Sequence, residues 1–440
     1  MDAVIHASQA FDGRLSVPQD KAICHRAALA AALASGRTEI APWPIADDCQ
    51  RTLRLIRGLG VTALMADGAL TIEGRGPDGL KAPQAELPCG ESGTTMRLAA
   101  GVLAGQPFAS TLAAAPSLAR RPMRRIVEPL TRMGASIMGD GGAGEVYPPL
   151  RIRGKRPLKA IRYEVPVASA QVKSAILFAG LFGDGPTTVI EPHATRDHTE
   201  RLLRRCGVRL RAEGRVIAVE PGPLTAPGRL AIPGDFSSAA FFLVAGACVP
   251  GARIELQDVG LNPTRTALLE VLKRMGAAIQ VEETAGADWE PLGRIRVAAQ
   301  PLVAVTVDPA DVPGLIDELP VLMVAAACAT GTTRLLGIGE LRVKETDRIQ
   351  SMVDGLSRLG ASIRAAGRDT VEIAGGPLSG ATVNSVGDHR TAMSLAIAGL
   401  VAKGTTTIRG AQCVAKSFPE FFGLLAGVAG SSTVKTVDSA

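Results

Sequence analysis

The sequence is poor in aromatic residues, which make up only 3% of its 440 positions and include two Trp and two Tyr. Proteins that bind single-stranded nucleic acid stack the bases on aromatic side chains, so this scarcity argues against that function. The net charge is +6, but Lys and Arg are scattered rather than gathered in blocks. A small anionic ligand therefore explains the charge better than a nucleic-acid groove does.

Metal and redox motifs are also missing. The seven Cys show no paired CxxC spacing, and the five His form no HExxH or similar pattern. Such usage is typical of a reducing compartment, and it gives no sign of zinc. We therefore expect a cytoplasmic protein with no metal site and no cofactor.

Long hydrophobic runs are absent as well. The longest apolar runs, 239–249 and 319–329, are shorter than the roughly 18 residues that a spanning helix needs. Residues 1–21 contain no apolar stretch typical of a signal peptide. With 46% hydrophobic and 20% charged residues, the composition predicts a globular protein without a membrane segment.

What the sequence does contain is a repeated unit, in which an amphipathic helix ends at Gly and a strand follows. A glycine just past the last helical residue ends a helix at low steric cost. The six copies, the last of them weaker, are 51–60, 125–134, 198–207, 266–276, 348–360 and 418–427.

Each unit also contains a second helix that is rich in Ala, Leu and Val on nearly every face, which predicts burial. These helices are expected at 21–33, 94–103, 170–181, 237–248, 317–329 and 390–401. The unit is longer than a solenoid repeat. We therefore predict an α/β fold of six units, three in each of two domains.

Two chain crossovers are predicted, one near residues 17–20 and one at Pro233-Gly234. They divide the chain into an N-terminal domain at 19–233 and a discontinuous C-terminal domain made of 1–18 plus 234–430. The small, polar residues 431–440 are expected to form a flexible tail.

The most informative stretch is the heptapeptide RVKETDR at 342–348, which follows a strand-like segment and precedes a helical pattern. Its carboxylate, Glu345, lies among cations, an arrangement that suits proton transfer beside a polyanionic substrate. A solvated, self-neutralising turn explains the same residues equally well.

Other polar residues cluster where the buried helices begin. Backbone N–H groups there are unpaired and attract anions. Each group also has a plainer explanation, such as a surface cation, a tight turn, an N-cap or compensation of the helix dipole. The residues concerned are Lys21, Arg26, Gly93, Arg121, Ser169, Gln171, Asp317, Glu318, Asp388, Arg390 and Lys416. Taken together, they predict a positive cleft for two small polyanions, with acid–base chemistry and no metal.

Several motifs resemble those of the 5-enolpyruvylshikimate-3-phosphate synthase family. RVKETDR is highly specific for that family, and the resemblance runs from about residue 15 to residue 422. Supporting matches are GDFSSAAFF (234–242), DHRTAM (388–393), RPM (121–123), SAQVK (169–173), RDHTE (196–200) and NPTR (262–265). The last three resemble the branch that is often tolerant of glyphosate. The family fold has two domains of three βαβαββ-type units each.

The resemblance implies the residue roles. The catalytic residues would be Lys21, Asp317 and Glu345. Shikimate 3-phosphate would be held by Lys21, Ala22, Arg26, Ser169, Ala170, Gln171, Thr195, Asp317 and Lys344. Phosphoenolpyruvate would be held by Lys21, Gly93, Arg121, Gln171, Arg348, Arg390 and Lys416. The substrates are the only partners expected, without nucleic acid or membrane, and the protein is expected to be a monomer.

The implied reaction transfers the carboxyvinyl group of phosphoenolpyruvate to the 5-hydroxyl of shikimate 3-phosphate through a tetrahedral intermediate. Two departures stand out, because the family usually has Ser at position 22 and Asn at position 91, where this chain has Ala22 and Glu91. They leave open a divergent transferase that acts on another cyclic alcohol.

Two further alternatives remain. UDP-N-acetylglucosamine enolpyruvyl transferase shares the fold but normally carries a catalytic Cys, which the corresponding region 113–121 lacks. A non-catalytic, anion-binding relative is the other alternative.

Overall fold

The computed structural model describes residues 1–8, 10–142, 144–284 and 289–438. Contacts divide the chain into two compact units. We call Lys21–Ile232 the N-terminal unit, and Met1–Asp20 with Pro233–Ala440 the C-terminal unit. The domain boundaries expected from the sequence stay a prediction, and each unit is described by itself.

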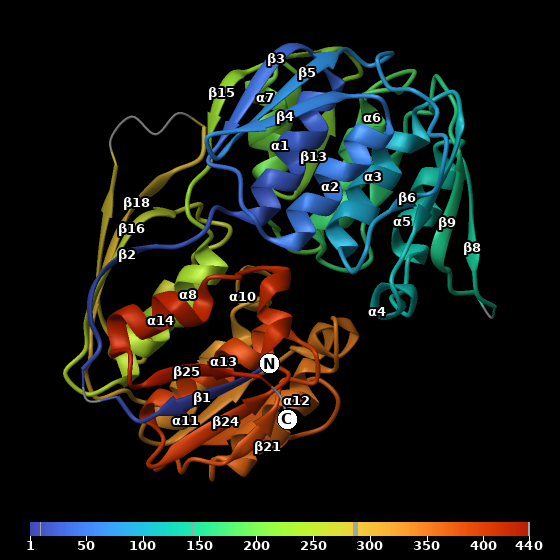
Figure 1. The fold of residues 1–440 in the computed structure, drawn as a ribbon. Coiled ribbons are helices and arrows are strands. Elements are labelled where there is room, and N and C mark those ends of the chain that lie inside the picture. Colours follow the sequence, from blue (N-terminus) through green and yellow to red (C-terminus); the bar gives the residue numbers. More distant parts are fainter. Residues whose placement is uncertain (9, 143, 285–288, 439–440) are drawn as a thin grey trace. The chain divides into compact units, whose positions relative to one another are not determined.

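The N-terminal unit contains three sheets in its described residues (Figure 1). Its helices are α1 (Lys21–Leu33), α2 (Asp47–Gly58), α3 (Gly93–Ala104), α4 (Pro116–Ala119), α5 (Arg124–Arg132), α6 (Ala170–Gly180) and α7 (His198–Arg205). Its strands are β3 (Ala34–Ala41), β4 (Thr62–Ala66), β5 (Ala69–Arg75), β6 (Leu87–Pro88), β7 (Ala109–Ala113), β8 (Ser136–Asp140), β9 (Tyr147–Arg153), β10 (Arg162–Glu164), β11 (Thr187–Ile190), β12 (Leu210–Glu213), β13 (Val216–Val219), β14 (Leu224–Thr225) and β15 (Gly228–Ala231).

The C-terminal unit also contains three sheets in the part of the chain that the structure describes. Its helices are α8 (Phe236–Cys248), α9 (Ala267–Arg274), α10 (Val312–Leu315), α11 (Leu319–Cys328), α12 (Arg348–Arg358), α13 (His389–Val401) and α14 (Phe421–Ala429), with 3-10 helices η1 (Gly339–Val343) and η2 (Ala411–Lys416). Its strands are β1 (Asp2–His6), β2 (Asp12–Ser16), β16 (Arg253–Gly260), β17 (Ala278–Glu283), β18 (Leu292–Ala298), β19 (Thr306–Val307), β20 (Thr332–Leu335), β21 (Ser362–Ala365), β22 (Val371–Ala374), β23 (Thr382–Asn384), β24 (Thr405–Arg409) and β25 (Val434–Val437).

All six sheets share one pattern, in which an edge strand runs parallel to its neighbour and the two remaining pairings are antiparallel. The N-terminal unit has the orders β14-β3-β5-β4, β6-β7-β9-β8 and β10-β11-β13-β12, and β15 also pairs with β3. The C-terminal unit has β17-β18-β16-β2, β19-β20-β22-β21 and β23-β24-β1-β25. The predicted α/β fold of six units is confirmed.

The predicted buried helices are α1, α3, α6, α8, α11 and α13, and most of their residues are inaccessible to solvent. Within the N-terminal unit α3 packs against both α1 and α6, and within the C-terminal unit α8, α11 and α13 pack against one another. Helices that are apolar all round can only be stable in such a surrounding.

Glycine ends the amphipathic helices as predicted. The glycines at 60, 134, 207, 276 and 360 all have φ between 80° and 106°, a left-handed conformation that glycine adopts at little cost. The sixth copy was placed too early, because Gly427 lies inside α14 and Gly430 follows its end with φ 95°.

Two further expectations were wrong. The C-terminal tail is not wholly flexible, because Val434–Val437 pairs with β1 as the edge strand β25. The sequence Val-Lys-Thr-Val is rich in residues that favour a β-strand, and Val434 is buried. The fifth buried helix begins at Leu319 rather than at residue 317, because the short helix α10 precedes it.

Searches of the described residues find no helix long and apolar enough to cross a membrane. They also find no group of three or more His, Cys, Asp or Glu that could hold a metal ion. The seven Cys are free thiols.

Candidate active site

In the N-terminal unit, side chains at the starts of neighbouring helices contact one another. The Gln171 amide at the start of α6 accepts a hydrogen bond from Arg97 (2.6 Å) and donates one to Thr94 (2.8 Å), both from α3. Lys21, the first residue of α1, pairs with Asp48 in the first turn of α2 (Nζ–Oδ2 2.9 Å). Gln171 and Lys21 are thus fixed by partners from adjacent helices.

Arg26 is buried one turn further along α1, with 2% of its surface exposed. Its guanidinium donates to the hydroxyls of Thr199 (2.8 Å) and Ser174 (2.9 Å) and to the carbonyl of Ala22 (2.7 Å). These bonds fix the orientation of the guanidinium. A buried cation held in this way is suited to binding a carboxylate.

Gly93 opens α3 directly against Arg121. A Cβ atom at Gly93 would lie 2.7 Å from Nη1 of Arg121, far inside van der Waals contact. The Ser92 hydroxyl caps the same helix by accepting from the N–H of Thr95 (3.2 Å). An open helix N-terminus with a guanidinium beside it can bind an anion.

Two of the expected shikimate contacts have other bonds in this structure. Ser169 caps α6 by accepting from the N–H of Val172 (3.4 Å), which is the plainer role that the sequence allowed. The Thr195 hydroxyl donates to Glu191, which is itself paired with the buried Lys173 (3.0 Å). Ala170 is the first residue of α6.

Glu91 lies in the loop before α3, where a carboxylate near bound anions needs a compensating cation. Arg51 supplies positive charge next to this loop, because a Cβ atom on the adjacent Gly90 would lie 2.6 Å from its Nε. Arg51 also pairs with Asp47 at 3.1 Å.

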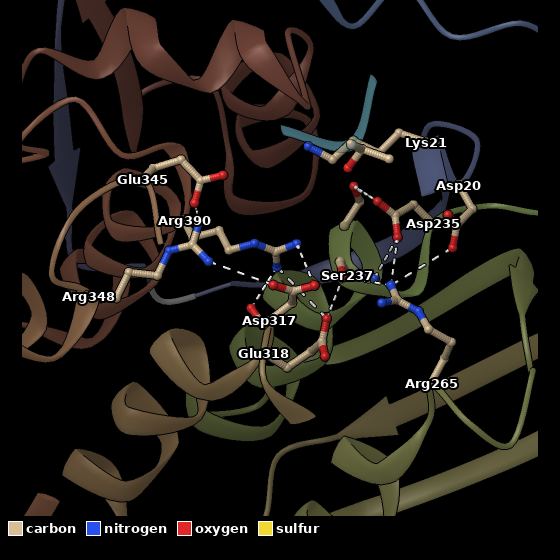
Figure 2. A network of polar contacts seen from close by, with 12 residues as sticks. Asp20, Lys21, Asp235, Ser237, Arg265, Asp317, Glu318, Glu345, Arg348 and Arg390 are labelled. Atoms are coloured by element: carbon tan, nitrogen blue, oxygen red, sulfur yellow. Dashed lines mark hydrogen bonds and ion pairs between the residues drawn. The ribbon is translucent and has the colours of Figure 1, made fainter. Parts of the chain in front are cut away.

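Arg348 is the centre of the C-terminal group and is almost wholly buried (Figure 2). It donates to Asp388 (Nε–Oδ2 2.8 Å) and to Glu345 (Nη2–Oε2 2.6 Å), and its Nη1 lies 3.7 Å from Oδ1 of Asp317. Burial opposes its charge, but the three carboxylates outweigh that effect and raise the pKa of Arg348. The cation is therefore permanent.

Arg390 links this group to the start of α11. It donates to the carbonyl of Asp317 (2.6 Å), and its Nη2 lies 3.8 Å from Oδ2 of the same residue. Asp388 caps α13 by accepting from the N–H of Arg390 (2.8 Å). Burial alone would raise the pKa of Asp388, but the positive charges of Arg348 and His389 together hold that pKa below its ordinary value. Lys416 donates to the carbonyl of Gly387 (3.3 Å), which places it at the same helix start.

The RVKETDR segment runs from η1 into α12 rather than directly from strand to helix. Arg342 pairs with Asp347 (2.7 Å), and Asp347 caps α12, so this part matches the self-neutralising turn. Lys344 does not fit a self-neutralising turn, because burial lowers its pKa to about 8. The nearby Asp317 opposes this fall in pKa, and Arg348 adds to it.

The predicted residues therefore form two groups, one within each unit. The expected excess of positive charge does not hold for the C-terminal group, whose arginines are surrounded by Asp317, Glu318, Glu345 and Asp388. Carboxylates are needed there because a buried guanidinium without a partner is costly.

Sequence reasoning assigned no role to Arg97, Asp48 or Thr199, and it placed Asp388 at a helix start without indicating its contact with Arg348. A signal existed for Arg97, which is a charged residue inside an otherwise apolar helix, one turn after Gly93. Asp388 stands before a buried helix, which is a cap position. Nothing in the spacing of Asp48 or Thr199 indicates that they contact Lys21 and Arg26.

The six-unit fold and the two groups of acids and cations define a transferase of the enolpyruvyl transferase type. The fold is similar to that of an enolpyruvyl transferase from Streptomyces tendae, with a TM-score of 0.80 over 100% of this chain and 99% of that chain at 17% identity. This likeness concerns the fold alone.

Closer relatives define the family. An EPSP synthase structure from Acinetobacter baumannii has a TM-score of 0.87 and 42% identity, with complete coverage of both chains. The 3-phosphoshikimate 1-carboxyvinyltransferase of Geobacillus kaustophilus is 48% identical over 413 residues, 93% of this chain and 96% of the relative. The family model for EPSP synthase (3-phosphoshikimate 1-carboxyvinyltransferase) matches residues 5–425. The chain belongs to the EPSP synthase family.

Membership confirms the resemblance that the motifs indicated, as well as the predicted enzyme class. The protein is a transferase of the shikimate pathway, which transfers the enolpyruvyl group from phosphoenolpyruvate to shikimate 3-phosphate.

Proposed function

We propose that residues of both groups act on the two substrates: the N-terminal unit supplies Lys21, Arg26 and Arg121, and the C-terminal unit supplies the acid–base residues. The observation that carries this proposal is the pairing of both expected proton carriers, Asp317 and Glu345, with the buried Arg348.

Shikimate 3-phosphate is held by Lys21, Arg26, Ser169, Gln171, Thr195 and Lys344, with Ala22 and Ala170 contributing main-chain atoms and shape. Arg26 is suited to the carboxylate, because its hydrogen bonds fix the orientation of the guanidinium. Phosphoenolpyruvate is held by Gly93, Arg121, Gln171, Arg348, Arg390 and Lys416 together with Lys21. Guanidinium groups match the geometry of both its carboxylate and its phosphate.

Addition begins when the 5-hydroxyl oxygen attacks C2 of phosphoenolpyruvate. Asp317 accepts the hydroxyl proton, and its carboxylate lies near both Arg348 and Arg390. Glu345, assisted by Lys21, delivers a proton to C3. Its carboxylate is held by a hydrogen bond from Arg348.

Elimination reverses these roles. The C2–O bond to phosphate breaks, Asp317 returns its proton to the leaving phosphate, and Glu345 removes a proton from C3 to restore the double bond. Both carboxylates are then ready for another cycle, which is the behaviour expected of a general acid and a general base that exchange roles.

A phosphate-release assay with phosphoenolpyruvate and shikimate 3-phosphate tests this function. We expect release that depends on both substrates. Release only with another cyclic alcohol would support the divergent transferase, and no release with any acceptor would support an anion-binding relative. The 48% identity to a 3-phosphoshikimate 1-carboxyvinyltransferase favours the first outcome. Ala22→Ser and Glu91→Asn, separately and together, test whether the two departures weaken acceptor binding.

We also propose that the protein works in the cytoplasm as a monomer. Both active-site groups belong to one chain, so a single copy holds every residue that the mechanism uses. Light scattering across a range of protein concentrations, combined with specific activity, tests this, because a dimer required for activity would lose activity on dilution.

Gly93→Ala is expected to raise the KM for phosphoenolpyruvate selectively. The added methyl group would lie 2.7 Å from Nη1 of Arg121 and must displace that guanidinium. Losing one hydrogen bond to a charged group costs about 1.5–3 kcal/mol, so the KM should rise by about 10- to 100-fold. Steady-state kinetics should show an unchanged KM for shikimate 3-phosphate. Gly101, in the same helix, cannot serve as a control position, because a Cβ atom there would strike the backbone of Ala175. An equal rise in both KM values would contradict the assignment.

Affinity for shikimate 3-phosphate is expected to fall as the pH rises through about 8. Lys344, with its pKa lowered to about 8 by burial, carries a charge below that pH and loses it above, when it no longer attracts phosphate. Calorimetric titration should show weakening that approaches about tenfold per pH unit above the pKa, the limit for a group that must be protonated. Lys344→Arg keeps the charge at every pH and should remove this dependence. The same dependence in Lys344→Arg would assign it to another group.

A further inference from the structure

The two segments that join the units are paired side by side within the C-terminal unit. The N–H of Asp20 donates to the carbonyl of Pro233 (2.9 Å), and the N–H of Asp235 donates to the carbonyl of Pro18 (2.7 Å). Gln19 and Gly234 form an antiparallel bridge between them. Each crossover segment thus carries one aspartate next to this bridge, with Asp20 opposite Pro233 and Asp235 opposite Pro18.

Arg265 lies between these two aspartates (Figure 2). Its Nη2 is 3.2 Å from Oδ1 of Asp235 and 3.8 Å from Oδ2 of Asp20, and only 3% of the residue is exposed. Burial, reinforced by the neighbouring Asp20, raises the pKa of Asp235 to about 6, and Arg265 opposes that rise. The arginine therefore holds two carboxylates together that would otherwise repel each other in a poorly solvated place.

A chain of polar contacts continues from Arg265 to the proposed catalytic residues. Arg265 donates to the Ser237 hydroxyl (2.7 Å), which in turn donates to Glu318. Glu318, 1% exposed, precedes α11 and lies 3.8 Å (Oε1) from Nη1 of Arg390. That same nitrogen donates to the carbonyl of Asp317.

We infer that Arg265, Ser237 and Glu318 are positioning residues, which connect the paired crossover segments to Asp317 and Arg390 and hold these two in the geometry that the reaction needs. The inference rests on the proposed roles of Asp317 and Arg390 and goes beyond them. None of the three positioning residues needs to touch substrate.

The physical reason is the stiffness of a buried chain of hydrogen bonds and ion pairs. Hydrogen bonds are electrostatically stronger in a medium of low dielectric constant, and each member limits where the next can lie. A misplacement of about 1 Å far from the chemistry can cost about 100-fold in rate. Arg265 contacts an aspartate of each crossover segment. A change in the pairing of these segments would therefore displace Arg265 and, through Ser237 and Glu318, also Asp317 and Arg390.

Ser237→Ala is the sharpest test, because it removes the link between Arg265 and Glu318 and leaves both ion pairs of Arg265 intact. We expect kcat to fall and the KM for phosphoenolpyruvate to rise, each by about 3- to 30-fold, as for a displaced positioning group. Ser238→Ala is the matched control, since Ser238 is equally buried on the same helix and contacts only Asp235 among these residues (3.4 Å). The control should change neither value.

A second measurement separates positioning from stability. Glu318→Gln keeps the size of the side chain, and the double variant Ser237→Ala/Glu318→Gln should be no worse than the more damaged single variant, because both changes break one chain. The urea midpoint of Ser237→Ala should match that of Ser238→Ala. Unchanged kinetics in Ser237→Ala, effects that add fully, or losses that follow the urea midpoint would overturn the inference. Activity of the wild-type protein and of Asp317→Asn tests the proposed function separately.

Discussion

Glu345→Gln is expected to lower kcat by about 10²–10⁴-fold, the range typical of losing a general acid–base group. The amide keeps the size of the side chain and can still accept the hydrogen bond from Arg348, but it cannot carry a proton to and from C3. Dissociation constants for both substrates should change by less than about threefold, because Arg348 and Arg390 remain in place. Single-turnover phosphate release and equilibrium titration measure the two effects separately.

The chain offers a close control for this substitution. Glu372 is also partly exposed and also pairs with arginines, Arg334 and Arg364, but it lies in β22 within a sheet pairing. Glu372→Gln should leave kcat unchanged. If Glu345→Gln kept a normal kcat, or if it lost substrate binding and rate in proportion, Glu345 would not be a proton carrier.

Arg348→Met is expected to have the largest effect on stability. It leaves Asp388, Glu345 and Asp317 without the cation that they share, and the side chain concerned is only 1% exposed. Removing one partner of a buried ion pair costs about 3–5 kcal/mol, because the remaining charge stays buried and uncompensated. Any folded fraction should fail to bind phosphoenolpyruvate.

The two tryptophans allow this effect to be located. Trp43 belongs to the N-terminal unit and Trp289 to the C-terminal unit, so in a Trp43→Phe background the fluorescence reports on the C-terminal unit. Urea unfolding of Arg348→Met should then shift strongly, whereas Arg342→Met, in the same segment but more exposed, should shift by about 1 kcal/mol or less. Equal shifts would show that the Arg348 cluster adds no special stability.

The fold was largely predictable because its signals are local and repeated. The spacing of apolar residues predicts the helix before Gly60. The φ of 80° at Gly60 is the left-handed conformation expected of a glycine that ends a helix. The buried helix α1 has the predicted bounds, since a run of Ala, Leu and Ile can only be stable away from water. The tail was misjudged because β25 depends on a partner, β1, more than 400 positions earlier in the chain.

The candidate site residues could be named from the sequence, but their bonding could not be predicted. A motif such as RVKETDR names Glu345 and Arg348, yet nothing in it indicates that Arg348 is buried against Asp388. Likewise, the contact of Lys21 with Asp48 joins residues 27 positions apart on different helices. Long-range side-chain pairs depend on tertiary packing, which periodicity does not encode.

The central claim is that residues of both units act on the same pair of substrates. A crystal structure of Asp317→Asn with shikimate 3-phosphate and phosphoenolpyruvate tests it most directly, because this variant should bind both ligands and turn over slowly. We predict that the bound phosphoenolpyruvate contacts Lys21 and Arg121 of the N-terminal unit as well as Glu345, Arg348 and Arg390 of the C-terminal unit. Phosphoenolpyruvate held by residues of one unit alone would contradict the account.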